Sequence, residues 1–197
     1  CEAGLYSLEE GARLVAERGR LMQQLSGAGA MLAVSAGEKE VTKELADWAG
    51  KLSVAAVNAP RQVVVGGEKE AVEALEQRCR ERGVQTQRLR VSHAFHTQQM
   101  DPMLEAYLEQ AQRVQYQPPR RKWVSTGAGE PGSEAGQMAQ YWARQVRQPV
   151  EFARAVKKLA EEGVDTFVEL GPRATLLSYV AQGLAEKQPK LHACGRA

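Results

Sequence analysis

The sequence predicts an α/β fold built in two parts. Between residues 30 and 91, strand-like runs and helical stripes follow in the order β-α-β-β-α-β, the order of the ferredoxin-like split βαβ unit. Between residues 92 and 186 helices alternate with strands, and a buried strand at 166–170 leads through Gly171-Pro172 into a last helix. Residues 1–29 contribute one amphipathic helix. We therefore expect a small sheet-and-helix unit inserted into a larger α/β layer.

The first helix is predicted to begin at a capping box. In Ser7-Leu8-Glu9-Glu10 the serine hydroxyl can accept from the N–H of Glu10, whose carboxylate reaches back to the N–H of Ser7. Gly27-Ala28-Gly29 ends the helix. One face carries apolar side chains at helical spacing: Leu14, Val15, Leu21, Met22 and Leu25.

Arg18 lies on the same stripe, so a guanidinium points where apolar side chains point. A charge in that place is costly unless it is paired. One interpretation is a salt bridge to a carboxylate of the protein. The other is a clamp for an acidic ligand, because the planar guanidinium matches a carboxylate with two hydrogen bonds.

Four strands and two helices are expected between residues 30 and 91. The strands are 30–34, 53–57, 62–65 and 84–91. The first helix carries Val41, Leu45, Trp48, Ala49 and Leu52 at helical spacing. Gly66-Gly67 opens the second helix, which carries Val72, Leu75 and Cys79. Asn58-Ala59-Pro60 has two interpretations: a turn, which is preferred, and a ligand contact.

The rest of the chain predicts a second set of elements. They are a helix over 103–111, a short strand at 123–125, a flexible loop over 127–136, a helix over 138–146, a helix from Pro149 at position N1, a strand at 166–170 and a last helix from Leu176 to Leu184. Glu169-Leu170-Gly171-Pro172 has two interpretations: a strand-to-helix corner, which is preferred, and a ligand contact.

Composition excludes several classes of function. Net charge is +2, and the one dense basic cluster, Arg120-Arg121-Lys122, is short, so a nucleic-acid surface is not expected. Three cysteines without a Cys-x-x-Cys argue against a disulfide framework and a zinc ribbon. No run approaches the roughly 20 apolar residues of a membrane span. We expect a cytoplasmic protein, and the start at Cys1 suggests a piece of a longer polypeptide.

His93 and His96 are the most informative pair in the sequence. They lie three residues apart where a strand-like run passes into an amphipathic helix, the kind of junction where open α/β folds place catalytic side chains. Three interpretations stay open for them: structural histidines, a metal pair that lacks a nearby third ligand, and general base catalysis. Their spacing alone does not decide which histidine would act.

Four segments in this order resemble the acyltransferase domain of modular polyketide synthases and the malonyl-CoA:acyl carrier protein transacylase of fatty acid synthesis. They are Arg18-Gly19-Arg20-Leu21-Met22-Gln23, Ala56 to Gly67, Val91 to Met100 and Val168-Glu169-Leu170-Gly171-Pro172. The resemblance covers nearly the whole chain. It implies part of an α/β-hydrolase-like large subdomain, formed by residues 1–29 and 92–186, with an inserted ferredoxin-like small subdomain at 30–91. Residues 187–197 resemble the start of the linker after the domain.

The resemblance also implies roles for single residues. His96 matches the general base of the family, and Arg18 matches the arginine that holds the malonyl carboxylate. His93-Ala94-Phe95-His96 looks like the malonyl-selective form of a tetrad that reads Tyr-Ala-Ser-His in methylmalonyl-selective relatives. His93 and Phe95 are therefore expected to bind substrate. Asn58, which lies in the resembling segment from Ala56 to Gly67, is expected to bind substrate as well. Glu151 stands in a Pro-Val-Glu-Phe run whose family counterpart supplies a backbone carbonyl to the histidine.

The implied reaction is ping-pong transfer of a malonyl unit from coenzyme A to the phosphopantetheine thiol of an acyl carrier protein. It implies no cofactor and no metal, and its partners are the carrier protein and other polyketide synthase domains such as a ketosynthase. The chain departs from the family because it contains no Gly-x-Ser-x-Gly, the segment of the nucleophile, and the upstream segment that completes the oxyanion hole is missing as well. The alternatives are a non-catalytic docking or structural module and a related domain that loads another acyl group.

Overall fold

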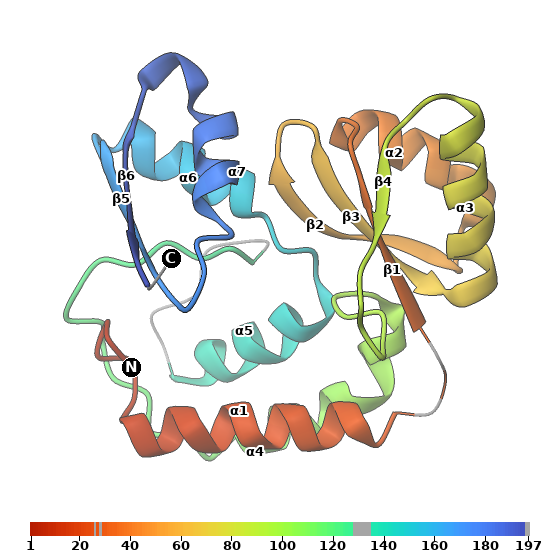
Figure 1. The fold of residues 1–197 in the computed structure, drawn as a ribbon. Helices are drawn as coiled ribbons and strands as arrows, with labels where there is room; N and C mark the ends of the chain where they lie inside the picture. The colour runs from red at the N-terminus through yellow and green to blue at the C-terminus, as the bar shows by residue number, and fades with distance from the viewer. Residues whose placement is uncertain (26, 28, 128–134, 196–197) are drawn as a thin grey trace.

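The computed structural model describes residues 1–25, 27, 29–127 and 135–195 (Figure 1). A four-stranded sheet with two helices on one face stands beside a layer of three helices, and the two helices of a separate two-stranded sheet contact strand β2 (Leu52–Ala59) of the four-stranded sheet. The mixed α/β architecture that the sequence predicts is confirmed.

The small sheet has the order β2-β3-β1-β4, and all three of its pairings are antiparallel. Its elements are β1 (Gly29–Val34), α2 (Glu38–Glu44), the 3-10 helix η1 (Leu45–Trp48), β2 (Leu52–Ala59), β3 (Gln62–Glu68), α3 (Lys69–Glu81) and β4 (Thr86–Arg88). The predicted β-α-β-β-α-β order is therefore observed, with the sheet order of a ferredoxin-like unit.

Several boundaries in this unit differ from the prediction. Asn58 belongs to strand β2, and the turn before β3 is Pro60-Arg61. Gly66 and Gly67 do not open a helix: β3 is a central strand, and its ladders to β1 and β2 hold both glycines in extended backbone. The predicted last strand is reduced to Thr86–Arg88. In each case pairing with a neighbouring strand, which one segment of sequence does not reveal, sets the end of the element.

The two faces of this sheet are covered differently. Helices α2 and α3 bury one face around Leu32, Val63 and Leu75. The opposite face is covered by the segment that follows β4, which packs Ala94 and Phe95 against a group of residues of the sheet. The strand-to-helix junction that carries both histidines therefore lies on the face of the sheet opposite α2 and α3.

The helical layer consists of α1 (Leu8–Gln23), α4 (Leu104–Gln112) and α5 (Ala135–Arg147), with the 3-10 helix η2 (Gln98–Met103) leading into α4. In Figure 1, α1 and α4 run side by side, and α5 packs against α4. The predicted capping box is confirmed, because Ser7 N donates to Glu10 and Glu10 N donates to Ser7 Oγ. Val15 was predicted on the buried face but is 72% exposed, because it lies about 100° around the helix from Leu14.

The remaining elements form a second, parallel sheet with its helices. They are α6 (Phe152–Glu161), β5 (Thr166–Leu170), α7 (Leu177–Gly183), the 3-10 helix η3 (Ala185–Lys187) and β6 (Lys190–Cys194). β5 pairs in parallel with β6, a strand that the sequence analysis missed within the expected linker. The predicted corner is confirmed: the Glu169 carboxylate accepts hydrogen bonds from the N–H groups of Thr175, Leu176 and Leu177 at the start of α7.

Two predictions in this part are wrong. Helix α6 begins at Phe152, not at Pro149, because Val150 is held in extended backbone by hydrogen bonds with Ala55 and Val57 of β2. No strand forms at 123–125, where Trp123 instead stacks on Trp142. The predicted loop over 127–136 falls largely on residues 128–134, outside the described residues, while 135–136 belong to α5. Across the described ranges, none of the helices has the length and apolar character that crossing a membrane requires.

Candidate active site

The loop around His96 is braced on both sides of that residue. Ala94 and Thr97 are fully buried. The Thr97 hydroxyl donates to Ala94 O at 2.7 Å and accepts from Gln99 N at 3.2 Å. The Gln99 side chain in turn accepts from Ala94 N at 3.3 Å. Between these contacts His96 adopts φ +59°, a left-handed conformation that is uncommon outside glycine and persists where the surroundings enforce it.

The imidazole of His96 is held through one nitrogen. Its Nδ1 lies 3.0 Å from Gln145 O and 3.0 Å from Gln148 O. Because a carbonyl only accepts hydrogen bonds, Nδ1 carries the proton of the neutral ring, and Nε2 keeps its lone pair. Burial and, next, the charge of Arg18 lower the pKa of His96, while the two carbonyls oppose that shift. The ring is therefore neutral near pH 7 and able to accept a proton at Nε2.

Arg18 brings a charge to the same place from α1. The side chain is partly buried, its Nε has no hydrogen-bond partner, and burial lowers the pKa of the guanidinium. Within the described residues Arg18 forms no ion pair, so the interpretation as an internal salt bridge finds no partner there. Tyr107, buried on α4, interacts with this charge, which lowers the phenol's pKa against the larger raising effect of burial.

His93 and Phe95 flank the base position differently. His93 Nε2 lies 3.3 Å from Leu25 O and its Nδ1 lies 2.9 Å from Ser92 Oγ, so the ring ties the loop to the chain after α1. Phe95 packs both on the small sheet and on the helical layer, and its ring centroid lies 6.2 Å from that of His93. The two side chains thus line the junction between the two parts of the fold.

Two expected residues stand apart from this arrangement. Asn58 is partly buried in β2, at an irregularity of the β2–β3 register, and in the described part of the chain no hydrogen bond joins its side chain to Arg18 or His96. Glu151 was expected to supply the carbonyl for the histidine, and this is wrong: the acceptors are Gln145 O and Gln148 O. The Glu151 carbonyl instead accepts from Ala155 N at the start of α6.

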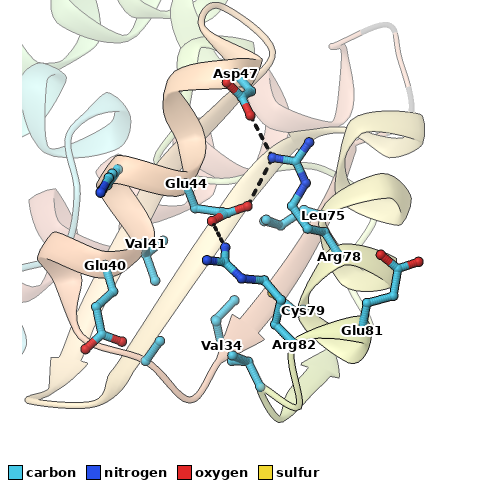
Figure 2. A pocket seen from close by; sticks show the side chains of 13 residues that line it. Val34, Glu40, Val41, Glu44, Asp47, Leu75, Arg78, Cys79, Glu81 and Arg82 are labelled. Carbon is cyan, nitrogen blue, oxygen red and sulfur yellow. Dashed lines mark hydrogen bonds and ion pairs between the residues drawn. The ribbon is translucent and has the colours of Figure 1, made fainter.

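A separate cavity of about 930 Å³ opens on the other side of the small sheet, between α2 and α3 (Figure 2). Arg78 spans its rim, with ion pairs to Glu44 at 3.1 Å and Asp47 at 2.7 Å, and Arg82 also pairs with Glu44. None of the expected site residues lines this cavity. Over the residues that the structure describes, no group of His, Cys, Asp and Glu side chains is arranged to hold a metal ion.

The candidate site therefore combines an imidazole that can accept a proton at Nε2 with a guanidinium that pairs with no carboxylate among the described residues. The family described as "Acyl transferase domain" matches residues 2–195. The chain belongs to this family. Its acyl transferase fold is shared by the acyltransferase domain from the second module of the salinomycin polyketide synthase, with a TM-score of 0.91 and 44% identity over 98% of this chain.

Relatives of this acyl transferase domain are parts of much longer proteins. It is 45% identical over 186 residues to the spectinabilin polyketide synthase system protein NorB of Streptomyces orinoci, and 39% identical over 184 residues to erythronolide synthase EryA2 of Saccharopolyspora erythraea. These matches include 94% and 93% of this chain, but only 9% of the length of NorB and 5% of the length of EryA2. This chain spans 46% of the salinomycin acyltransferase chain.

A solved complex adds a relative that is bound to a partner. A malonyl-transacylase solved with its type II polyketide acyl carrier protein, PlMCAT:AntF, matches this acyl transferase domain with a TM-score of 0.86 and 28% identity, over 98% of this chain and 63% of that chain.

Three residues of the candidate site were missed in the sequence. Gln145 and Gln148 act through backbone carbonyls, which every residue type has, so no side-chain pattern marks them. Tyr107 was assigned to the stripe of a helix, and it is indeed buried. The only signal at Tyr107 was its hydroxyl, because a buried tyrosine usually needs a polar neighbour.

Proposed function

We propose that this chain carries the base and the carboxylate-binding arginine of a malonyl transferase, which moves malonyl from coenzyme A to the phosphopantetheine thiol of an acyl carrier protein. The observation that supports this most concerns His96 and Arg18: among the described residues, His96 Nε2 forms no hydrogen bond and Arg18 pairs with no carboxylate. The nucleophile serine lies outside residues 1–197 in this proposal, because the chain contains no Gly-x-Ser-x-Gly.

His96 acts as the proton carrier in both halves of the reaction. Nε2 takes the proton of the serine hydroxyl as its oxygen attacks the thioester carbonyl, and returns that proton to the departing coenzyme A sulfur. In the second half, Nε2 takes the proton of the phosphopantetheine thiol, whose sulfur attacks the malonyl ester. The serine oxygen then leaves with that proton. No cofactor takes part, since malonyl-CoA and the carrier protein are substrates.

Arg18 selects the donor by its free carboxylate. Two parallel N–H···O bonds from the guanidinium would hold the malonyl carboxylate and leave the thioester beside Nε2. An acetyl donor would leave the guanidinium unpaired, which argues against a domain that loads acetyl. Other polyketide synthase domains, a ketosynthase among them, are the proposed neighbours of the domain in its parent chain.

The base assignment is tested in a chain extended upstream by a segment with Gly-x-Ser-x-Gly. His96→Asn keeps a residue that tolerates the left-handed backbone, so loss of the base is separated from strain. Transfer should fall by about 10²-fold or more. His93→Asn, the matched control, should cost much less. Small and equal losses in both variants contradict the assignment.

The arginine assignment is tested with two donors. Arg18→Ala should weaken malonyl transfer strongly and leave acetyl transfer intact or improved, because only the malonyl thioester has a free carboxylate. Comparable losses with both donors would make Arg18 structural. Residues 1–197 alone, incubated with malonyl-CoA, should show no stoichiometric malonyl adduct by mass spectrometry. Such an adduct on any serine would contradict a nucleophile outside these residues and favour another mechanism.

A further inference from the structure

The end of helix α5 leaves one carbonyl without its helical donor. Gln148 N donates to Arg144 O at 2.9 Å, so the helical pattern of hydrogen bonds continues as far as Gln148. The next donor in the pattern would be the N–H of residue 149, and its acceptor would be Gln145 O. Residue 149 is proline, which has no N–H. Gln145 O is therefore free to accept from another group.

That group is His96. Its Nδ1 lies 3.0 Å from Gln145 O as well as 3.0 Å from Gln148 O. The chain beyond the proline is anchored, because Val150 N donates to Ala55 O at 2.9 Å and Val150 O accepts from Val57 N at 2.8 Å. Proline also disfavours helical backbone at the preceding residue, which helps to end the helix at the turn that presents Gln148 O.

We propose that Pro149 is a positioning residue for His96. By withholding an N–H from the last turn of α5, it reserves Gln145 O for the imidazole and gives Nδ1 two main-chain acceptors. These acceptors fix the proton on Nδ1, orient the ring and direct Nε2 away from the helix. The importance of this arrangement for catalysis rests on the proposed role of His96 as base. The arrangement itself consists only of hydrogen bonds within residues 1–197.

The test is an NMR pH titration of residues 1–197 with isotope-labelled histidine. The chain has three histidines, His93, His96 and His192, and His96→Asn assigns the signal of His96. In Pro149→Ala, the new N–H competes for Gln145 O. A hydrogen bond that favours the protonated ring is thereby weakened, so the titration midpoint of His96 should move to lower pH.

A matched pair isolates the N–H itself. Lactic acid in place of Pro149 gives an ester that has the methyl side chain of alanine but no N–H, so the His96 midpoint should stay near that of the wild type. Pro149→Gly adds the same N–H as Pro149→Ala. It is a second, independent variant in which the His96 midpoint should show the same downward shift. Gln145→Ala keeps the carbonyl and should leave the midpoint unchanged.

Two outcomes overturn the proposal. One is an unchanged His96 midpoint in a folded Pro149→Ala or Pro149→Gly chain. The other is an equal shift in the ester and in Pro149→Ala, which would mean that loss of the ring, not gain of the N–H, moves His96. Neither readout involves turnover. A shifted midpoint, together with no acyl transfer by the chain extended upstream with Gly-x-Ser-x-Gly, would uphold the positioning and reject the proposed function.

Discussion

Arg18 and His96 come from separate parts of the chain, one from the first helix and one from the loop after β4, yet the charge of the guanidinium lowers the pKa of the imidazole. Burial is the larger cause of that shift. Arg18 therefore has two effects in the proposed site: it offers hydrogen bonds to a carboxylate, and it weakens the base while no carboxylate is bound.

Binding of malonate should raise the pKa of His96. A carboxylate on Arg18 offsets the positive charge beside the imidazole, so the protonated ring is less disfavoured. An NMR titration of residues 1–197 with and without malonate checks this. In Arg18→Met, which keeps a long apolar side chain, the midpoint of His96 should already lie higher and should not respond to malonate. A response of equal size in both chains would place malonate elsewhere.

Folding stability should fall as His96 is protonated. The ordinary imidazole pKa is 6.5, and that of His96 is lower in the fold, so the unfolded chain binds more protons. The contribution of His96 is complete above pH 6.5 and is lost as the pH falls through the folded pKa. His96→Asn should lack this component. Urea unfolding of both chains between about pH 7.5 and pH 5.5 measures it, and parallel pH profiles of the two chains would refute it.

A methyl group at position 66 should disturb the loop that holds His96. A Cβ on Gly66 of β3 would lie 2.9 Å from Thr97 Cγ2 and 3.3 Å from Ala94 Cβ. Gly66→Ala should lower the free energy of unfolding by about 1–3 kcal/mol, as overpacking usually does. Adding Thr97→Ser removes Cγ2, keeps the hydroxyl and should recover part of the loss.

The control for this substitution lies on α1. A Cβ on Gly19 would meet no atom within 4 Å, so Gly19→Ala should stabilise the chain by roughly 0.5–1 kcal/mol through helix propensity. Denaturant unfolding of the wild type and the three variants gives the comparison. An unchanged free energy of unfolding in Gly66→Ala would show that the loop moves aside without loss of stability.

Selectivity for the acyl donor should respond to Phe95. This ring precedes the base and packs at the junction of the two parts of the fold. If the acyl α-carbon faces it, as the family resemblance implies, a bulky ring leaves little room for an α-methyl branch. Phe95→Ser with His93→Tyr should raise methylmalonyl relative to malonyl transfer in a domain that includes the nucleophile. One methyl group is worth only about 1–3 kcal/mol in a shaped pocket. The ratio of the kcat/KM values for methylmalonyl and malonyl should therefore rise, but neither donor should be excluded. An unchanged ratio would leave Phe95 a packing residue.

The order of elements was predictable because periodicity and capping are local properties. The capping box at Ser7 and the strand at 166–170 are both observed. The errors occur where a partner distant in sequence decides. Val150 pairs with β2 and delays α6, and Lys190–Cys194 becomes a strand only because β5 lies beside it.

The site was predictable as far as side chains carry the signal. Arg18 stood out as a charge on an apolar stripe. Its lack of an ion pair among the described residues favours the interpretation as a clamp for an acidic ligand over that as a salt bridge. The choice between His93 and His96 was open from spacing. Within the part of the chain that the structure describes, His93 uses both ring nitrogens in hydrogen bonds, while His96 uses only Nδ1. The carbonyls of Gln145 and Gln148 could not be predicted, since they are main-chain atoms placed by the end of a helix.

The strand β5 has a consequence for handling the chain in solution. Its side chains Val168 and Leu170 are 54% and 82% exposed, and β6 covers only one of its edges in the sheet that the structure describes. A bare apolar edge is a template for another strand. Residues 1–197 should therefore self-associate reversibly as concentration rises, and light scattering should record a mean mass that falls on dilution. Val168→Lys, which puts a charge beside that edge, should keep the chain monomeric at concentrations where the wild type is not.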